Sequence, residues 1–176
     1  MDGQHPPFHL RLFKDSDEAS IVRHANNPEV ARFLRDIFPS PYTLEDAKWW
    51  IQLGSKVEGT LNRAIDVQGE CVGSIGARFC DNEHRFSAEI GYWLGETFWG
   101  QGIMSSAVRQ FTQFLFENYE LKRIFAPVAH PNLPSIAVLK KCGYRLEGVF
   151  KQHMFLKGAL FDEHIFAIYP QDCESS

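Results

Sequence analysis

The sequence predicts an α/β (α+β) fold in which a mixed, mostly antiparallel central sheet of about seven strands is flanked by helices. Three strand-like segments follow one another between residues 61 and 94 with only short polar turns between them, as is typical of antiparallel neighbours. Helical segments with one apolar face precede and follow this run. Near the end of the chain, two further strand-like segments meet at Lys157-Gly158 and predict a hairpin.

The first 60 residues predict one strand and three helices. Apolar and polar residues alternate over residues 8–13, which predicts the strand. Asp15 begins a helix that ends at Asn26-Asn27-Pro28, and a second short helix follows the proline to about Leu34. Two prolines predict a stiff loop over residues 36–42. Thr43, with an aspartate three positions on, resembles a capping box and begins the third helix.

The middle of the chain predicts three consecutive strands at residues 61–67, 71–79 and 86–94. A helix that ends near Asn118 follows, and then a strand over residues 123–129. The apolar side chains of this helix recur at helical spacing and should face the core: Met104, Ala107, Val108, Phe111 and Leu115.

Pro127 lies inside the predicted strand over residues 123–129. Proline has no N–H group, so it is poorly tolerated in a strand that is hydrogen-bonded on both sides. We therefore expect imperfect pairing of this strand with one neighbour. An edge strand would tolerate the proline equally well.

The last third of the chain predicts a helix and the final hairpin. Asn132 is a good N-cap, and Gly143 after two lysines is a typical helix end. The hairpin strands are expected at residues 144–156 and 159–169. The polar tail after Pro170 is expected to fray.

Composition limits the possible classes of protein. The chain has 176 residues, of which 44% are hydrophobic, and this favours one domain over residues 1–176 with a core at about 8–169. Its formal net charge is −4. The acidic balance and the absence of a long basic cluster argue against a nucleic-acid partner bound through phosphate neutralisation. No apolar run is long enough to cross a membrane, and no apolar leader follows Met1. We expect a cytoplasmic protein that is a monomer or homodimer and whose four cysteines are reduced thiols.

The turn between the third central strand and the following helix holds Gly100 and Gly102. A strand that enters a helix through such a turn aims several unpaired N–H groups and the positive end of the helix dipole at one place. No acidic residue occurs over residues 97–116. The turn is therefore a candidate anion site. The alternative is a tight turn without a ligand, with Ser105 or Ser106 as the helix cap.

Two common phosphate-binding patterns do not fit this turn. A P-loop ends in Gly-Lys-Ser/Thr, and the turn contains no lysine. A dinucleotide-binding turn has a third glycine where Ser105 stands, and an acidic residue about 20 positions further on at the end of a strand. That distance reaches Glu120, which precedes the next predicted strand.

Two segments resemble the GNAT acetyltransferases, and within them the RimJ/RimL branch. The first reads EIGYWL at residues 89–94 and FWGQGIMSSA at residues 98–107, like the acetyl-CoA-binding motif of that family. The second reads NLPS at residues 132–135, followed by KCGY and EG up to Gly148. The resemblance extends over residues 8–168. Trp99 and Met104 depart from the family's usual residues but leave the backbone N–H groups in place.

The resemblance implies acetyl-CoA as co-substrate, held by the turn and by Asn132. It also implies that the strands at residues 86–94 and 123–129 splay apart around the pantetheine arm, in agreement with Pro127. The seven histidines show no metal-ligand spacing, so no metal is predicted. The cofactor-binding positions that we predict are Trp93, Leu94, Trp99, Gly100, Gln101, Gly102, Ile103, Met104, Ser105 and Asn132.

Acetyl transfer to an amine requires a neutral amine and a protonated leaving thiolate. Glu89 is the candidate base, because strand alternation places it on the face opposite Ile90 just before the turn. The resemblance places Ser135 near the cofactor sulfur as the candidate acid. The alternatives are a salt-bridged strand glutamate for Glu89 and helix capping for Ser135. Tyr144 is a rival acid that more simply packs in the core, and Cys142 lacks the histidine partner of a nucleophile.

The predicted function is an acetyl-CoA-dependent N-acetyltransferase that acts by direct transfer on a primary amine, such as a protein N-terminus, an amino acid or a small amine. A catalytically inactive acyl-CoA-binding module and an NAD-dependent enzyme are the alternatives. Aromatic walls for the acceptor are expected between residues 39–50 and the final hairpin, from these side chains: Phe38, Tyr42, Trp49, Trp50, His153 and Phe155.

Overall fold

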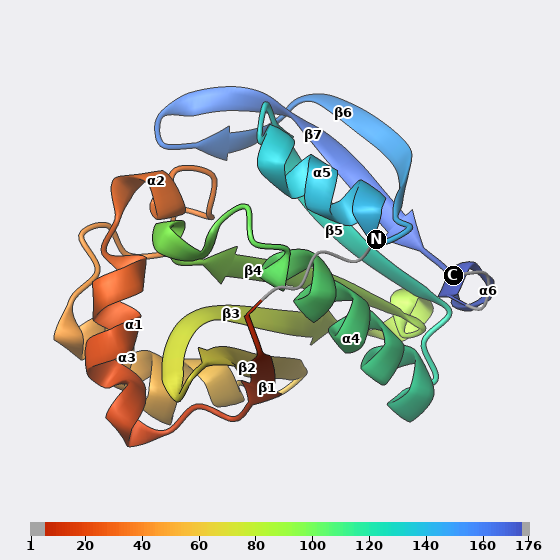
Figure 1. The fold of residues 1–176 in the computed structure, drawn as a ribbon. Coiled ribbons are helices and arrows are strands. Elements are labelled where there is room, and N and C mark those ends of the chain that lie inside the picture. The colour runs from red at the N-terminus through yellow and green to blue at the C-terminus, as the bar shows by residue number, and fades with distance from the viewer. Residues whose placement is uncertain (1–5, 174–176) are drawn as a thin grey trace. The chain divides into compact units, whose positions relative to one another are not determined.

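The computed structural model describes residues 6–173 (Figure 1). These residues divide into two compact units. The first unit contains the described residues up to Gly76 together with Tyr92–Met104. The second contains Ala77–Gly91 and the described residues from Ser105 onward. The chain therefore crosses between units within its third strand, within its fourth strand and at the start of its longest helix. Each unit is described separately below.

Seven strands form one sheet in the order β1-β2-β3-β4-β5-β7-β6. The pairs β1–β2, β5–β7 and β6–β7 are antiparallel, whereas β4 runs parallel to β5. This arrangement confirms the predicted mixed, mostly antiparallel sheet. The strands are β1 Phe8–Arg11, β2 Thr60–Val67, β3 Glu70–Phe79, β4 Ser87–Leu94, β5 Arg123–His130, β6 Arg145–Leu156 and β7 Ala159–Ile168.

The helices confirm most of the predicted elements. The capping box of α3 forms as expected, because the Thr43 side chain accepts from the backbone of Asp46 and the Asp46 side chain accepts from the backbone of Thr43. The second helix ends three residues earlier than predicted, at Ala31. The α-helices are α1 Glu18–Ala25, α2 Pro28–Ala31, α3 Leu44–Gln52, α4 Ile103–Asn118, α5 Leu133–Lys141 and α6 Pro170–Cys173. Short 3₁₀ helices cover Asp15–Asp17, Gly54–Lys56, Asn82–His84 and Glu96–Phe98.

The first unit has a core built from α1, α3 and the strands beside them. Its buried members come from segments far apart in the sequence: Ile21, Ala25, Tyr42, Ala47, Ile51, Ala64 and Cys71. Burial of these apolar side chains supplies the main stabilising free energy of this unit.

An ion network joins β1, β2 and the start of α1 within the first unit. Arg11 donates from Nε to Asp66 Oδ2 over 2.6 Å and from both terminal nitrogens to Asp17 over 2.7 and 2.8 Å. Asp17 is 1% exposed and Asp66 is 6% exposed. The two carboxylates depend on one guanidinium, because buried charges require partners.

The second unit packs α4 and α5 against its strands. The apolar face that the sequence predicted for α4 is buried, since Ala107, Val108, Phe111 and Leu115 are at most 1% exposed. The helix α5 contacts β5, and β6 and β7 form the long hairpin drawn in blue (Figure 1). At the hairpin turn, Lys157 and Gly158 have φ angles of 50° and 82°, which are those that a tight two-residue turn requires.

The expectation of a frayed tail after Pro170 is wrong for residues 170–173, which form α6. Asp172 holds this short helix to the sheet by accepting from the Tyr169 backbone and from the Arg145 side chain, which lies 3.0 Å away. Both contacts depend on tertiary structure, so the polar composition did not reveal them. Residues 174–176 lie outside the described part of the chain.

Candidate active site

The bend that follows β4 belongs to the first unit up to Met104 and exposes its backbone. Gly100 and Gly102 have φ angles of 73° and 81°, a left-handed conformation that favours glycine. A Cβ atom added to Gly100 would meet nothing within 4 Å. The first turn of α4 contains no acidic side chain. These backbone donors and the positive helix end therefore suit an anionic ligand.

Two side chains of the bend form hydrogen bonds with backbone carbonyls in the same segment. Trp99 Nε1 donates to the Leu94 carbonyl over 2.8 Å, and Gln101 Nε2 donates to the Thr97 carbonyl over 2.9 Å. Trp99 and Gln101 thus stabilise the bend. Both residues are predicted from the sequence to be cofactor-binding positions. Their contact with a cofactor stays a prediction.

The helix α4 begins at Ile103, so Ser105 and Ser106 lie inside it. The alternative in which one of these serines caps the helix is therefore wrong. The side chains of Ile103, Met104 and Ser105 are at most 8% exposed. Their buried side chains leave only the backbone N–H groups for a ligand, and contact of these three residues with a cofactor stays a prediction.

The other predicted cofactor positions of the first unit are partly or fully buried. Leu94 is 7% exposed. Trp93 packs against Phe38, with ring centroids 6.0 Å apart, and Phe38 in turn contacts Tyr42. Phe38 and Tyr42, expected as walls of an acceptor pocket, therefore belong to the core of the first unit. Trp49, which was also expected as a wall of the acceptor pocket, is 54% exposed.

In the second unit, Glu89 ends a short parallel ladder between β4 and β5. The register pairs Ser87 with Arg123, Ala88 with Ile124 and Glu89 with Phe125, and stops there. Pro127 follows Phe125 by two residues. On the side of β5 that faces away from β4, Pro127 pairs with Ile165 of β7. The imperfect pairing that Pro127 predicted is thus confirmed on the β4 side. The early end of the ladder agrees with strands that part to admit a cofactor arm.

The Glu89 carboxylate is ion-paired with Arg78. Arg78 Nη2 donates to Glu89 Oε2 over 2.5 Å, and the Glu89 side chain is 13% exposed. A charge-assisted pair with a guanidinium fixes the orientation of a carboxylate. The arrangement matches the salt-bridged alternative, and the role of Glu89 as base stays a prediction.

Sequence reasoning did not find Arg78, although a signal for it exists. Cys80 N donates to Ser87 O across the turn between β3 and β4. Arg78 precedes Cys80 by two residues and Glu89 follows Ser87 by two residues, so Arg78 lies opposite Glu89. Opposite charges at equal distances from a predicted hairpin turn are a recognisable cross-strand pair.

Asn132 and Ser135 form the N-terminal cap of α5 in the second unit. Asn132 Oδ1 accepts from the Ser135 N–H over 3.3 Å, which confirms Asn132 as the N-cap. Ser135 lies in the first turn of the helix and is partly buried. The capping bond uses the backbone N–H of Ser135.

Tyr144 lies in the core of the second unit. Its side chain is 2% exposed, and its hydroxyl lies 2.7 Å from Thr112 Oγ1. This position favours the packing role that the sequence suggested over the role of rival acid.

Burial raises the pKa of the Cys142 thiol to about 11, although Arg109 and Lys141 oppose the shift. A thiol with this pKa is mostly protonated at neutral pH, and the thiolate is the reactive form. We expect iodoacetamide at pH 8 to alkylate Cys142 about 100-fold more slowly than a free cysteine. Mass spectrometry of the peptide that contains Cys142 measures the rate. Alkylation in urea is the control, and equal rates in the folded and unfolded chain would contradict the shift.

Within residues 6–173, no cluster of three or more His, Cys, Asp or Glu side chains has a geometry that could hold a metal ion. Among the helices of the same part of the chain, none is long and apolar enough to cross a membrane.

A seven-stranded, mostly antiparallel sheet with one parallel strand pair and flanking helices is the fold of the GNAT acetyltransferases. The chain belongs to the GNAT acetyltransferase family, since a family model described as Acetyltransferase (GNAT) domain matches residues 8–145. It is therefore an acetyltransferase, which replaces the NAD-dependent alternative.

Similar proteins support this assignment over most of the chain. An uncharacterized N-acetyltransferase, p20 of Bacillus licheniformis, is 30% identical over 169 residues, covering 93% of each protein. The ribosomal-protein-serine acetyltransferase of Escherichia coli is 38% identical over 81 residues, covering 46% of this chain and 45% of that protein. The structure of Mycobacterium smegmatis RimJ in complex with CoA-disulfide has a TM-score of 0.84 and 27% identity, covering 97% of this chain and 86% of that one. The RimJ/RimL-like resemblance is thereby confirmed.

Proposed function

We propose that this protein is a cytoplasmic N-acetyltransferase that transfers the acetyl group of acetyl-CoA directly to a primary amine, with both substrates bound together. The observation that carries the proposal is the exposed bend with left-handed Gly100 and Gly102, followed by a helix whose first turn holds no acidic side chain. The amine of a protein is the first acceptor class to test, because the similar Escherichia coli enzyme is named for a ribosomal protein. Amino acids and small amines are the other acceptor classes.

The backbone N–H groups of residues 100–105 would hold the diphosphate of coenzyme A, because consecutive amides at a helix start satisfy phosphate oxygens. Asn132 would bind the pantetheine with its side-chain amide while its oxygen caps α5. The bound thioester supplies an acetyl group that is activated toward attack by nitrogen.

Glu89 would act as general base and take a proton from the incoming ammonium or amine. A protein α-amine has a pKa of roughly 7.7–8.0, so a modest base is enough to prepare it at neutral pH. Ser135 would donate a hydrogen bond to the departing sulfur from the first turn of α5. A serine hydroxyl is a weak acid, so we assign it this hydrogen bond and no complete proton transfer.

Gly100→Val tests the bend. We expect the affinity for coenzyme A, measured by calorimetry, to fall at least tenfold, since the added methyl groups would stand between the amides and the diphosphate. Gly69→Val is the matched control, because Gly69 has a φ angle of 89°, equally open surroundings and a place in the β2–β3 turn. Both variants should lose similar stability, but only Gly100→Val should lose affinity. Equal affinity in both would overturn the proposed binding site.

Release of free thiol from acetyl-CoA across a panel of amines and peptides tests the enzyme. Turnover on peptides with a free N-terminus is the expected result. Tight binding of coenzyme A without turnover on any acceptor would instead identify a catalytically inactive acyl-CoA-binding module.

A further inference from the structure

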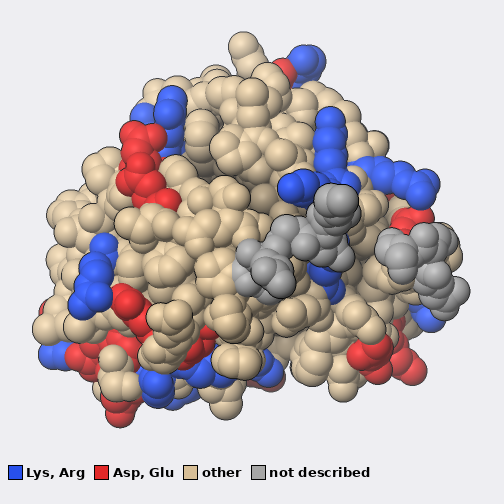
Figure 2. Space-filling model, in the orientation of Figure 1, with Lys and Arg blue, Asp and Glu red and all other residues tan. Residues whose placement is uncertain are grey.

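The β6–β7 hairpin of the second unit has a largely uncharged surface. Figure 2 shows mostly uncharged side chains in the upper part of the view, over the hairpin that Figure 1 labels, and the exposed apolar side chains of β6 include Val149, Phe150 and Phe155. The Glu163 side chain belongs to this hairpin and is only 14% exposed. Apolar surroundings strengthen the attraction between a carboxylate and a cation. A positively charged group is therefore attracted to Glu163.

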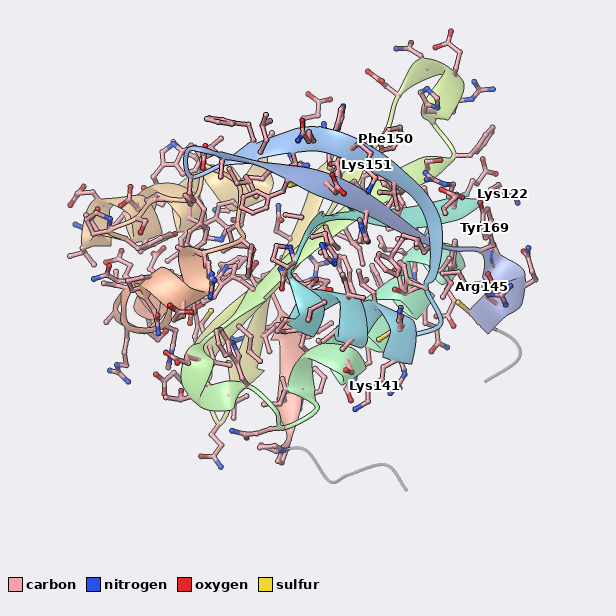
Figure 3. The ribbon with its side chains drawn as sticks, turned by 90° about the horizontal axis from the view of Figure 1, so that it is seen from above. Lys122, Lys141, Arg145, Phe150, Lys151 and Tyr169 are labelled. Carbon is pink, nitrogen blue, oxygen red and sulfur yellow. The ribbon has the colours of Figure 1, made fainter. Side chains whose placement is uncertain are left out.

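The ladder between β6 and β7 contains a bulge midway along the hairpin. Phe150 of β6, which Figure 3 labels, pairs with Glu163 of β7. The next pair is Met154 with Phe161, so that residues 151–153 lie opposite a single residue of β7. A bulge of this kind bends a strand and turns its side chains in new directions.

Asp162, the residue opposite the bulge, holds it in place. Its Oδ1 accepts from the Gln152 N–H over 2.9 Å, and its Oδ2 accepts from Lys151 Nζ over 2.7 Å. Gln152 has a φ angle of 48°, a conformation that is uncommon for residues other than glycine. Because successive side chains of a strand alternate, Asp162 and Glu163 lie on opposite faces of β7. The bulge is thus fixed from the face opposite to Glu163.

The bulge brings His153 beside Glu163, where His153 Nδ1 lies 2.5 Å from Glu163 Oε2. In a ladder without a bulge, His153 would stand opposite Leu160, whose side chain points to the other face from Glu163. The His153 side chain is 64% exposed, and its ring centroid lies 5.3 Å from that of Phe150. The imidazole is therefore held by a carboxylate and still reaches solvent.

Glu163 lies on the same face of the sheet as Glu89. Glu89 pairs with Phe125 at the last position of the β4–β5 ladder, and Glu163 pairs with Ala129, four residues further along β5. Paired residues share a face of a sheet, and so do residues an even number of positions apart on one strand. The Ala129 carbonyl accepts from the Asn132 N–H over 2.8 Å, at the turn into α5. Glu89 and Glu163 therefore flank, on one face, the stretch of β5 where the proposed function places the pantetheine arm.

The histidine partner distinguishes Glu163 from Glu89 and Glu147. Those two glutamates are paired with arginines, which stay charged at any working pH. Histidine instead gains and loses a proton near neutral pH. An ionised carboxylate only accepts hydrogen bonds, so Glu163 receives the N–H of Nδ1 and leaves Nε2 of His153 as an acceptor. A base that a carboxylate orients in this way is suited to proton transfer.

We propose that His153, oriented by Glu163, removes a proton from the ammonium form of the acceptor. The inference rests on the proposed function, in which the acceptor is a primary amine. Nε2 of His153 takes the proton, the electron pair of the broken N–H bond stays on the amine nitrogen, and the imidazolium returns the proton to water. The neutral amine then attacks the thioester, and the proton that nitrogen loses in this attack is taken by Glu89 and finally carried by the thiol. One acceptor ammonium thus gives one amide, one thiol and one free proton.

Two acceptors that differ only in their reactive nitrogen test the proposal: the best peptide of the acceptor panel and its analogue with an N-terminal aminooxy group. At pH 7 roughly a tenth of an α-amine is neutral, whereas the aminooxy group is neutral throughout. We expect His153→Gln to lower kcat/KM about tenfold for the peptide at pH 7, because only the neutral fraction then reacts, and less than about twofold for the analogue. The loss for the peptide should vanish toward pH 9. Glu163→Gln should show the same pattern with a loss of about threefold, because it weakens only the support of His153.

His84→Gln is the matched control, because His84 is an exposed histidine of the same unit in the turn between β3 and β4. It should keep kcat/KM for both acceptors. An unchanged rate of His153→Gln on the peptide, or equal losses on both acceptors, would overturn the inference and leave the proposed function intact. Lack of turnover by the unmodified protein on every acceptor of the panel would overturn the proposed function, and the inference with it.

Discussion

Glu89→Gln lowers kcat about 100- to 1,000-fold while the affinity for coenzyme A changes less than about twofold; this is the result that we expect from steady-state kinetics and calorimetry. Glutamine has nearly the same shape as glutamate but accepts no proton at neutral pH. The loss should therefore fall on the chemical step. It should also become smaller as the pH rises toward 9, because more of the acceptor amine is then neutral without the help of a base.

Glu147→Gln is the control for this experiment. Glu147 is a strand glutamate of the same unit that is ion-paired with an arginine, Arg123, as Glu89 is with Arg78. Its replacement removes a similar ion pair and should leave kcat within about threefold. If Glu89→Gln and Glu147→Gln lose activity to the same extent, or if Glu89→Gln loses none, Glu89 has no role in the mechanism.

Arg11→Met should destabilise the protein by about 3 kcal/mol, because it leaves Asp17 and Asp66 buried without their shared cation. For a chain of this length, a loss of that size lowers Tm by roughly 6–12 °C. Arg23→Met is the matched control. Arg23 pairs with Glu70 at the surface, its side chain is 65% exposed, and its loss should cost less than about 1 kcal/mol. Similar melting temperatures for the two variants would contradict the structural importance of the network.

The same network predicts a dependence of stability on pH. Burial alone would raise the pKa of Asp66, but hydrogen bonds from Arg11 and from the Gly69 amide outweigh it and hold the pKa below its usual value. The stability that Asp66 contributes is therefore present above about pH 4 and is lost as the pH falls through the lowered pKa. The difference in Tm between the unmodified protein and Arg11→Met should narrow below pH 4. A difference that stays constant down to pH 2 would contradict this coupling.

Local rules account for the elements that could be predicted from the sequence. The Thr43 capping box, the Asn132 cap and the Lys157-Gly158 turn each depend on residues within a few positions of one another. Pro127 correctly indicated an unpaired stretch, because a missing N–H group has the same consequence in any sheet. By contrast, residues 170–173 form a helix through contacts with Arg145 and Tyr169, which no local pattern reveals.

The sequence alone determined that this chain has a glycine bend between a strand and a helix, with no acidic residue over residues 97–116, because backbone conformation and charge there follow from neighbouring residues. Only the tertiary structure decided that Arg78 holds Glu89, that Tyr144 bonds Thr112 in the core, and that the end of α5 lies beside the start of α4. Such partners are set by strand register and helix packing, which bring together residues up to 37 positions apart.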